Sequence, residues 1–595
     1  MAAGCAAVPV SGGVVSATIP PGPGSGTDSG QSCCGVIMNA PQPDWGPQQI
    51  VTGFLLASAN FRDDHAAARE YLTAAASKAW RPGSAVTVVA QSPVVTLPQR
   101  PFRSQTEAVV QIQAQEVATL SGGGQYSPAP GGQQQLTWQF GVQLVNHQWR
   151  IATLPSSGVG QPSADDLLLT KDLFQLAYEP CNLYYFDPSG KVLVPDPVFV
   201  PRDSSDPATG LVEALLRSPA GWLAGAAFTA FPPKTRLRRP VQLLPGSTAL
   251  VDLSLPLGGA TEVGLRAVAA QLVWTLTSNS YSSSPAQSVQ LEVNGRAVSP
   301  GGISIPVQDR RDYPQLVPAP PDHENLYYLA ANGAARVLHE SAPGGASPSG
   351  QALPGQAGTG QIPLHILAVS PADERYLAGI AGPSNTVYTV DLAAAAENRA
   401  KSSAGALSAR LTGSGFTAIS WDRRDDLWVA GKVNGHTGVW VVPPGAARPI
   451  QVSLPPGTAP ITALRVARDG VRVAMIAGDG RLLLGAIIRS GGKISIMQNV
   501  AVGTDVTDPT ALSWYDADHL LVVAQSTAGP TLDEVPVDGD TSTAIGVQSN
   551  MVSIAAAGSF NPLYAGLQTN HLARSIGFSG LWSLFVPGSS ATYPG

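Results

Sequence analysis

Charged residues are scarce in this chain. They make up 13% of its 595 residues, about half the usual share in soluble proteins, so Ser, Thr, Gln and backbone groups must hydrate the surface. The formal net charge is −6, and no basic cluster is longer than the one from Arg236 to Arg239. A nucleic-acid-binding protein would concentrate positive charge, so nucleic acid is a poor candidate partner.

Cysteine and long hydrophobic runs are scarce as well. The four cysteines, Cys5, Cys33, Cys34 and Cys181, lack the evenly spaced pairs of a disulfide framework. Cys33 and Cys34 have no His or third thiol nearby, so we interpret them as an incidental pair, and Cys181 as a small buried hydrophobe. No apolar run reaches the roughly 18 residues of a membrane helix. Any attachment to a membrane must therefore be covalent or through a partner.

The N-terminal stretch matches the end of a bacterial lipoprotein signal. Small residues precede Cys5, although Ala2 stands where Leu is usual, and Gly, Pro and Ser dominate up to about Gln42. In such signals a peptidase cuts before the cysteine, whose thiol carries diacylglycerol. We predict that residues 1–42 are a signal remnant and flexible tether with Cys5 as the lipid attachment site; the alternative is an ordinary disordered terminus. The charged and apolar segments of a signal do not precede Cys5, which suggests a start codon placed too late or a truncated chain.

Glycine and proline are abundant, with 63 and 52 residues. Many turns are therefore expected, and the length predicts three or four domains. The predicted chain is multidomain and mainly β. Its parts after the tether are an α+β domain at residues 43–163, an α/β module at 164–299, a linker at 300–321 and a β-propeller at 322–595.

Helical and alternating patterns follow one another in the first domain. An amphipathic helix is predicted around Phe54, and an Ala-rich helix from Ala66 to Trp80. Alternation predicts strands at Val86 to Val95, Val110 to Ile112, Leu136 to Leu144 and Trp149 to Ile151. Two helices before a bent antiparallel sheet resemble the NTF2-like domains. The segment from Gln148 to Ile151 fits the last strand of these domains. In that fold a cone between helix and sheet either holds a ligand or is packed shut. The sequence offers no paired carboxylates or His–Asp positions that would make the cone catalytic.

The chain is organised around the stretch from Asn182 to Val298. Leu183 to Phe186 predicts a strand that ends in a turn at Asp187 to Gly190. A helix is predicted from Glu262 to Thr277 because its apolar residues share one face of a 3.6-residue period. Asn294-Gly295 predicts a tight hairpin turn.

This order of elements resembles the GerMN module of spore-germination proteins and envelope lipoproteins. The usual small-residue Gly-Pro after the first helix is Ser218-Pro219 here. The residues that carry the resemblance are Leu183 to Phe186, Leu211 to Leu216 with Pro219, Val251 to Ser254, and Gln271 to Leu276. The resemblance implies a GerMN α/β fold.

A repeat fills the C-terminal half. Thr417, Thr462 and Thr510 are 45 and 48 residues apart, a period typical of β-propeller blades. Five blades are visible, and Leu326 to His339 is a candidate for part of a sixth. The aligned segments are Leu364 to Ser370, Phe416 to Trp421, Ile461 to Val466, Pro509 to Trp514 and, more weakly, Met551 to Ala555.

Residues suited to catalysis or metal binding are not grouped in the sequence. The eight histidines form no H-x-x-x-H pair, and no Walker loop or G-x-S-x-G elbow follows a strand. Ser490 to Lys493 has the S-x-x-K spacing of penicillin-binding enzymes but lies on a glycine turn, whereas that chemistry needs Ser at a helix start. Asp538 to Asp540 is better explained by a hairpin turn than by calcium. The sequence predicts no enzyme activity, no cofactor and no metal site.

The signal cysteine, the NTF2-like domain, the GerMN module and the propeller together resemble the LpqB family of actinobacterial lipoproteins over nearly the whole chain. The resemblance implies a lipoprotein held on the extracytoplasmic face of the cell membrane through a palmitate-bearing Cys5. It also implies a partner, the extracellular domain of a sensor histidine kinase, and a role in two-component signalling and cell-wall homeostasis.

The second hypothesis is a cell-wall carbohydrate- or peptide-binding protein or hydrolase, with its site on a propeller face or in the cone. Exposed tryptophans beside acidic pairs would favour it, and the positions concerned are Trp421, Trp428, Trp440 and Asp425-Asp426. At their strand spacing, these tryptophans are more typical of a core.

Overall fold

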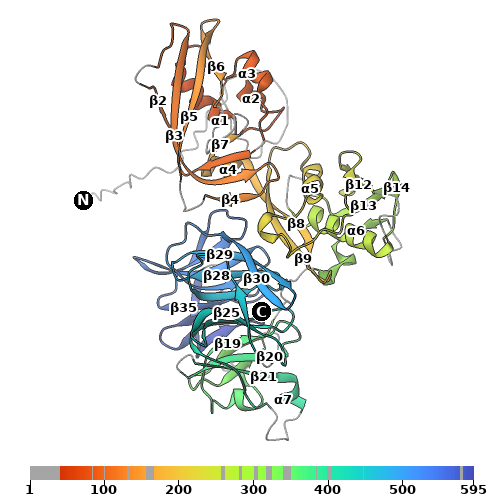
Figure 1. The fold of residues 1–595 in the computed structure, drawn as a ribbon, viewed down its shortest axis with the longest axis vertical. Helices are drawn as coiled ribbons and strands as arrows, with labels where there is room; N and C mark the ends of the chain where they lie inside the picture. Colours follow the sequence, from red (N-terminus) through yellow and green to blue (C-terminus); the bar gives the residue numbers. More distant parts are fainter. Residues whose placement is uncertain are drawn as a thin grey trace, which may run out of the picture. The chain divides into compact units, whose positions relative to one another are not determined.

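The computed structural model describes residues 40–595, apart from 84, 99–100, 130–133, 156–165, 256–260, 280–284, 301–305, 317–323, 340–349, 383–384, 398–404, 447 and 577–579. Its secondary structure is mainly β, as the sequence predicts (Figure 1). An N-terminal α+β domain, a central module and a propeller follow one another along the chain. The predicted lipid site Cys5 and the pair Cys33 and Cys34 lie outside the described residues.

The N-terminal domain is a sheet with its apolar face against helix α1. The main strand order is β6-β5-β3-β1-β7, in which β7 pairs in parallel with β1 and the other pairs are antiparallel. Alternation turns Trp138 and Phe140 toward Phe54 of α1, and all three are buried. The bounds are α1 (Pro47–Ala57), β1 (Ala85–Val89), β2 (Val94–Thr96), β3 (Glu107–Ser121), β4 (Tyr126–Pro128), β5 (Gln134–Val145), β6 (Gln148–Thr153) and β7 (Leu167–Thr170).

The single helix predicted from Ala66 to Trp80 is wrong. The structure has two short helices, α2 (Ala66–Arg69) and α3 (Ala74–Ala79). The break has a tertiary cause, because Leu72 forms a bridge with Ile151 of β6, and the N–H of the following residue donates to the Ile151 carbonyl over 2.9 Å. A distant strand thus overrides the local helix preference of alanine.

The single strand predicted from Val86 to Val95 is wrong as well. β1 ends at Val89, where a register shift interrupts its pairing with β3. β2 then pairs with a different part of β3, around Ile112. The chain bends between the two short strands, which follow the curvature of the long strand β3.

The N-terminal sheet continues past residue 163, where the sequence placed the domain border. β7 lies beside β1, and α4 (Lys171–Ala177) follows it with the Thr170 hydroxyl accepting from the Leu173 N–H over 3.2 Å. Phe174 of α4 is buried and stacks on Tyr178, with ring centroids 4.9 Å apart. The N-terminal core therefore runs directly into the first strand of the central module.

The central module joins a hairpin and a second sheet through one helix. The predicted hairpin is β8 (Tyr178–Phe186) with β9 (Leu193–Pro201). In the second sheet, β12 (Thr248–Ser254) and β13 (Ser288–Val293) run parallel, and helix α6 (Glu262–Thr277) makes the crossover that a parallel pair needs. The remaining elements are α5 (Pro207–Leu215), η1 (Gly221–Leu223), β10 (Arg236–Leu237), β11 (Gln242–Leu244) and β14 (Arg296–Ala297).

Helix α6 has the predicted bounds, and the middle of its predicted apolar face, including Leu272, is fully buried. Its polar side is buried too. The Gln271 amide accepts from the Ala230 N–H and donates to the Tyr184 carbonyl, both over 2.6 Å. The Thr275 hydroxyl accepts from the Tyr184 N–H over 3.2 Å. The helix is therefore enclosed between the hairpin and the second sheet.

Part of the predicted linker at residues 300–321 belongs to the central module. β15 (Val307–Gln308) pairs with β13, next to the short helices η2 (Arg310–Asp312) and η3 (Pro314–Leu316). Tyr313 is fully buried there, and its hydroxyl donates to the Gln308 amide oxygen. This part of the linker contributes to a core.

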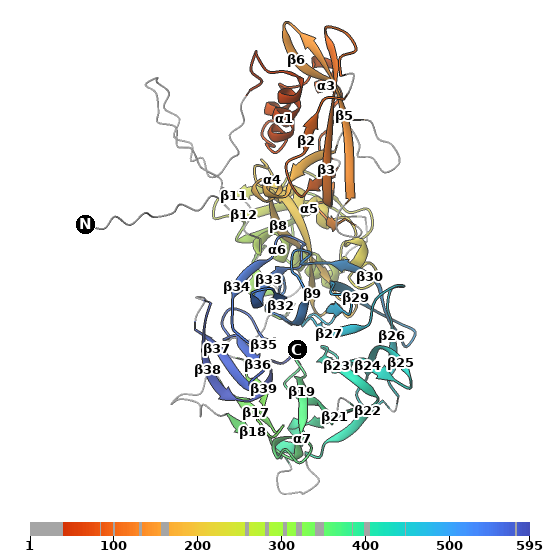
Figure 2. The same ribbon diagram turned by 90° about the vertical axis from the view of Figure 1, so that its left-hand side faces the viewer.

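Six blades of four strands form the propeller in the described part of the chain, and blades 3 and 4 are joined into one eight-stranded sheet through their outer strands. Figure 2 shows the blades arranged in a ring around the end of the chain. The aligned repeats are the inner strands of blades 2 to 6. The candidate for a sixth blade, Leu326 to His339, supplies β16 (Leu326–Leu329) and β17 (Ala335–Leu338) of blade 1. β39 (Ser589–Thr592) completes that blade by pairing with β16, which closes the ring.

The other propeller elements are, in blade 1, β18 (Gln351–Ala352) and η4 (Gln356–Gly358); in blade 2, β19 (Leu364–Val369), β20 (Tyr376–Ala381), β21 (Thr386–Asp391), α7 (Leu392–Glu397) and β22 (Ser408–Thr412); in blade 3, β23 (Ser414–Trp421), β24 (Leu427–Val433), β25 (His436–Val442) and β26 (Ile450–Ser453); in blade 4, β27 (Ile461–Val466), β28 (Arg472–Ala477), β29 (Leu482–Ser490) and β30 (Lys493–Ala501); in blade 5, β31 (Pro509–Trp514), β32 (His519–Ser526), β33 (Gly529–Pro536) and β34 (Thr543–Gly546); and in blade 6, β35 (Met551–Ala555), β36 (Tyr564–Leu567), β37 (His571–Ile576) and β38 (Leu581–Pro587).

Candidate functional site

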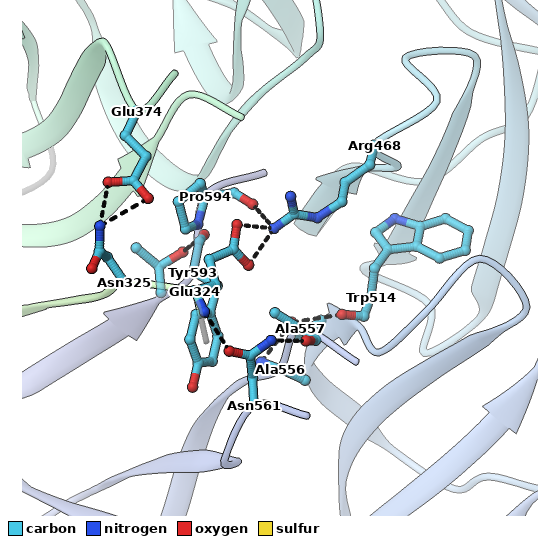
Figure 3. A network of polar contacts seen from close by, with 12 residues as sticks. Glu324, Asn325, Glu374, Arg468, Trp514, Ala556, Ala557, Asn561, Tyr593 and Pro594 are labelled. Atoms are coloured by element: carbon cyan, nitrogen blue, oxygen red, sulfur yellow. Dashed lines mark hydrogen bonds and ion pairs between the residues drawn. The ribbon is translucent and has the colours of Figure 1, made fainter. Parts of the chain in front are cut away.

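A buried polar network joins several blades near the end of the chain (Figure 3). Arg468, which follows β27, donates to both carboxylate oxygens of Glu324 over 2.6 Å and to the carbonyl of Pro594. The Glu324 N–H donates to Asn561 over 2.6 Å, and the Asn561 amide donates to the Ala557 carbonyl over 2.6 Å. The network thus connects residues from blades 1, 4 and 6.

This network is suited to holding the ring together and not to chemistry. Glu324 is 5% exposed, and burial raises the pKa of its carboxyl although Arg468 acts in the opposite direction. The Arg468 guanidinium already has the Glu324 carboxylate and the Pro594 carbonyl as acceptors, and the network contains no nucleophile beside a base. A buried, satisfied ion pair mainly specifies one arrangement of its surroundings.

A second buried ion pair links blades 3 and 4. Arg489 at the end of β29 donates to Asp422, which is fully buried and also accepts from the Trp428 indole N–H over 2.9 Å. Asp426 lies 3.6 Å from the same guanidinium. Burial and the neighbouring Asp422 raise the pKa of the Asp426 carboxyl to about 6. Both carboxylates, those of Asp422 and Asp426, are therefore paired with the guanidinium of Arg489 within the propeller.

The tryptophans that would favour a carbohydrate site on the propeller are in the core. Trp421, Trp428 and Trp440 are 4%, 0% and 7% exposed. Their indole N–H groups donate within the propeller, that of Trp421 to the Ala368 carbonyl over 3.3 Å. The structure thus follows the core interpretation of these three residues, and they provide no aromatic platform.

The cone of the N-terminal domain is packed shut. A cavity of only about 10 Å³ remains between α1 and the sheet, lined by Phe54, Trp80, Trp138 and Phe140 among others. This is at the lower limit for one water molecule. His65 packs edge-to-face against Trp80 with ring centroids 5.6 Å apart, and burial lowers the pKa of His65. The aromatic side chains themselves occupy the space in which a ligand would sit.

A buried carboxyl lies near the contact of the central module with blade 4. Asp196 of β9 accepts from the Ala220 N–H over 2.7 Å, and Val471 of blade 4 packs in the same apolar cluster as the central module. Burial raises the pKa of Asp196 to about 7, although the Ala220 N–H and the charge of Arg472 lower it. Arg472 is itself held by Asp469 over 2.6 Å. This contact is apolar with a few buried charges, and one carboxylate oxygen of Asp196 has no hydrogen-bond partner among the described residues.

The surface best suited to a partner is a groove between blades 5 and 6. It measures about 490 Å³, and its lining includes Tyr515, Ile545, Phe560, Leu563 and Trp582. Phe560, in the turn between β35 and β36, is 70% exposed. The groove also contains one acid and one base, Glu534 and Arg574. An exposed aromatic side chain beside a mostly apolar groove is typical of interaction surfaces.

Blade 6 also exposes apolar residues on its outermost strand. Leu581 and Leu584 of β38 are 61% and 67% exposed, and Trp582 between them lines the groove. In the described structure β38 pairs on one side only, with β37. Its other edge offers backbone N–H and C=O groups to an additional strand. We call the groove together with β38 the blade 6 surface.

The remaining residues singled out in the sequence have structural roles. Cys181 is buried, as expected, and burial raises the pKa of its thiol to about 12. Ser490 and Lys493 are paired across a glycine turn of the β29–β30 hairpin, not on a helix. Asp540 accepts from the Gln175 amide of α4 over 2.7 Å. Among the described residues, no group of three or more His, Cys, Asp or Glu is placed to hold a metal ion.

Comparison with known proteins gives matches along the whole described chain. Residues 40–164 match the family profile "Lipoprotein LpqB, N-terminal domain", residues 182–299 match "Sporulation and spore germination", and residues 346–576 match "Lipoprotein LpqB beta-propeller domain". A protein named Lipoprotein LpqB from Streptomyces avermitilis is 30% identical over 536 residues, covering 85% of this chain and 82% of the relative. The chain belongs to the LpqB family.

A second relative agrees with this membership. Lipoprotein LpqB of Thermobifida fusca is 29% identical and covers 100% of this chain and 97% of the relative. The crystal structure of TolB from Acinetobacter baumannii is 12% identical, with a TM-score of 0.34, and covers 46% of this chain and 68% of that one; this likeness is too low to carry an argument. LpqB proteins are lipoproteins and not a known enzyme family. No described helix is long and apolar enough to cross a membrane.

Sequence reasoning missed the blade 6 surface. Its lining comes from β33, β34, β37, β38, the loop after β31 and the turn between β35 and β36, which lie together only in the folded propeller. One local signal existed: the seven residues of β38 contain no charge and do not alternate between polar and apolar positions. An outer strand with this composition has apolar side chains left over after the core is filled.

Proposed function

We propose that this LpqB-family chain is a non-enzymatic regulator on the extracytoplasmic face of the cell membrane. In this proposal Cys5 carries the lipid anchor, and the folded domains bind the extracellular domain of a sensor histidine kinase. Binding then modulates two-component signalling and cell-wall homeostasis.

The blade 6 surface is the observation that carries the proposal. Phe560 and Leu584 are 70% and 67% exposed, and covering apolar surface contributes about 25 cal/mol for each Å² removed from water. The groove of about 490 Å³ beside them is large enough to take in several side chains of a protein partner. Its low charge suits the dry centre of a protein interface.

The lack of a grouped catalytic set supports a regulator over an enzyme. In the described ranges three buried carboxylates, those of Asp422, Glu324 and Asp469, are each paired with an arginine, whereas the buried Asp196 carboxyl accepts from the Ala220 N–H. An acid–base or nucleophilic mechanism needs such groups free and aimed at a substrate cavity. Release of soluble fragments from purified peptidoglycan by the purified chain would contradict this part of the proposal.

The lipid anchor explains how a modest surface would suffice. Confinement to the membrane raises the effective concentration toward a membrane-spanning partner, so a weak interface is occupied. Full-length protein with Cys5→Ser should lose palmitate labelling and leave the membrane fraction. Retention of both by this variant would place the anchor elsewhere.

Site-specific photo-crosslinking in the cell tests the partner. A photoreactive residue at Phe560 should capture the kinase, whereas one at Met497 should not. Met497 is a matched control because it is also apolar, 66% exposed and in an outer strand, β30 of blade 4. Capture of the kinase from both positions, or from neither, would contradict the proposed surface, and recovery of wall polysaccharide alone would favour the carbohydrate-binding alternative.

A further inference from the structure

The face of the N-terminal sheet that turns away from α1 is lined with amides. In β3 and β5, buried apolar residues alternate with outward-facing polar ones. Between residues 105 and 148 lie 11 of the chain's 33 glutamines. Those on the outer face of the two strands are Gln111, Gln113, Gln115, Gln135, Gln139 and Gln143.

The strand register places these side chains in rows. Gln111 lies opposite Gln139, and Gln115 lies opposite Gln135. Directly opposed residues of an antiparallel pair share a face, with neighbours about 4.8 Å apart across the strands and roughly 6.7 Å apart along them. The six amides therefore lie at regular intervals along the two strands, and we call this surface the amide face.

The amide face has unused hydrogen-bonding capacity. Within the described residues, its six side-chain amides form no hydrogen bond, and all but Gln111 are classed as exposed. Each amide offers two donor hydrogens and an acceptor oxygen. β5 contains no charged residue at all, although exposed sheet faces ordinarily carry charges that prevent association.

A groove of about 550 Å³ lies at one end of the amide face. Gln139 and Gln143 line it together with Thr137 and Thr153. Gly141 leaves the hollow between them, because a Cβ there would lie only 3.0 Å from the Thr153 Cβ. The groove contains one base and one acid, Arg103 and Glu107, whose formal charges cancel.

We propose that the groove and the amide face bind an uncharged polysaccharide chain. Sugar hydroxyls both donate and accept hydrogen bonds, and side-chain amides match them in both respects. An anionic polymer would need clustered Arg or Lys, and a protein partner would need an apolar anchor at the centre. The repeat of the amide face along β3 and β5 fits a ligand that is itself a repeating chain.

The affinity of the amide face should depend on the length of the polysaccharide chain. Hydrogen bonds exchanged with water contribute little each, so one sugar unit should bind weakly. Several units bound in succession along the same rows raise the overall affinity because each later contact is intramolecular. Binding should therefore strengthen with chain length. This site is separate from the blade 6 surface and does not depend on the kinase proposal.

Affinity electrophoresis of the purified full chain tests the proposal, with neutral polysaccharides in the gel. One arm uses a polymer of N-acetylglucosamine and another a polymer without acetamido groups, so that the arms identify the kind of sugar. Retardation by either polymer, increasing from short oligomers to long chains, is the expected result. Retardation by an anionic polysaccharide to the same extent would overturn the proposal.

A double variant, Gln139→Glu with Gln143→Glu, tests whether the polysaccharide binds in the groove. The change keeps side-chain size but replaces donors with charge, and it should weaken binding by roughly tenfold or more. The matched control is Gln451→Glu with Gln568→Glu, two exposed glutamines in the propeller. Thermal unfolding checks that both variants are folded; a somewhat lower midpoint is expected for the groove variant, because Gln143 lies opposite Glu107 in the strand register. Equal binding by both variants, or no binding of either neutral polymer by the parent chain, would overturn the proposal.

Discussion

Helix α6 and strand β38 distribute polarity in opposite ways. In α6, the polar residues Gln271 and Thr275 are fully buried, whereas in β38 Leu581 and Leu584 are 61% and 67% exposed. Gln271 can be buried because both ends of its amide have backbone partners. In a chain with so few charges, hydrogen-bond partners decide which polar groups are buried, and a cluster of exposed apolar residues beside a groove indicates an interaction surface.

The largest effect on the free energy of unfolding is expected when a charge is buried in α6 without a partner. Leu272→Asp should lower the free energy of unfolding by several kcal/mol, comparable to the stability of a small domain. The control is Val263→Asp in the first turn of the same helix, where the side chain is 79% exposed. Chemical denaturation measures both, and an unchanged midpoint for Leu272→Asp would mean that the helix buries a different face.

A smaller change tests whether its hydrogen bonds account for the burial of the Gln271 amide. Gln271→Leu keeps the volume but leaves the Ala230 N–H and the Tyr184 carbonyl without this partner, which should cost about 1–3 kcal/mol. Gln287→Leu, at an exposed position before β13, should change the free energy of unfolding much less. If both variants unfold alike, packing and not hydrogen bonding decides the burial of Gln271.

The buried Asp196 predicts how the central module responds to pH. Its folded pKa is about 7 because of burial, whereas an unfolded Asp titrates near about 3.9. The folded state binds more protons between these values, so stability should fall as the pH rises from about 4 to about 7, by at most about 1.4 kcal/mol per pH unit.

Replacing the carboxyl isolates this effect. Asp196→Asn keeps an oxygen that can accept from the Ala220 N–H but does not ionise, so the loss of stability over that pH range should become smaller. Denaturant unfolding across the range compares it with Asp172→Asn, which removes an exposed carboxyl in α4. Identical pH dependence in the two variants would show that Asp196 is ionised throughout.

The smallest effect on stability is expected at the blade 6 surface. Leu584→Ser removes an exposed apolar group without opening a cavity, so the free energy of unfolding should change by no more than about 0.5 kcal/mol. The same variant should reduce kinase capture from the photoreactive position at Phe560. A large loss of stability would mean that β38 is part of the core, and unaffected capture would exclude Leu584 from the interface.

Strong periodicity made much of the fold predictable. The bounds of α6 followed from its apolar residues, and the turn at Asn294-Gly295 has the positive φ angles of 53° and 77° that its sequence favours. The repeat located the inner strands of five blades. These features depend on residues close together in the chain.

What the sequence did not predict depends on distant partners. The break between α2 and α3 exists because Leu72 meets Ile151, and β39, with the sequence Ser-Ser-Ala-Thr, has no apolar pattern of its own. The blade 6 surface and the amide face likewise need strand register and ring geometry. The tightly packed cone could not be foreseen because its closure depends on how four aromatic side chains fit together.

The pairing of β16 with β39 has a consequence for how the protein is made. These strands belong to one blade, yet the five other blades lie between them in the sequence. Because the chain is synthesised from its N-terminus, the inner edge of β16 stays unpaired until β39 has been made. Contacts between such distant segments form slowly because a long loop must close first. The propeller should therefore complete its folding only after the whole ring has been synthesised, and its open edge needs protection from aggregation until then.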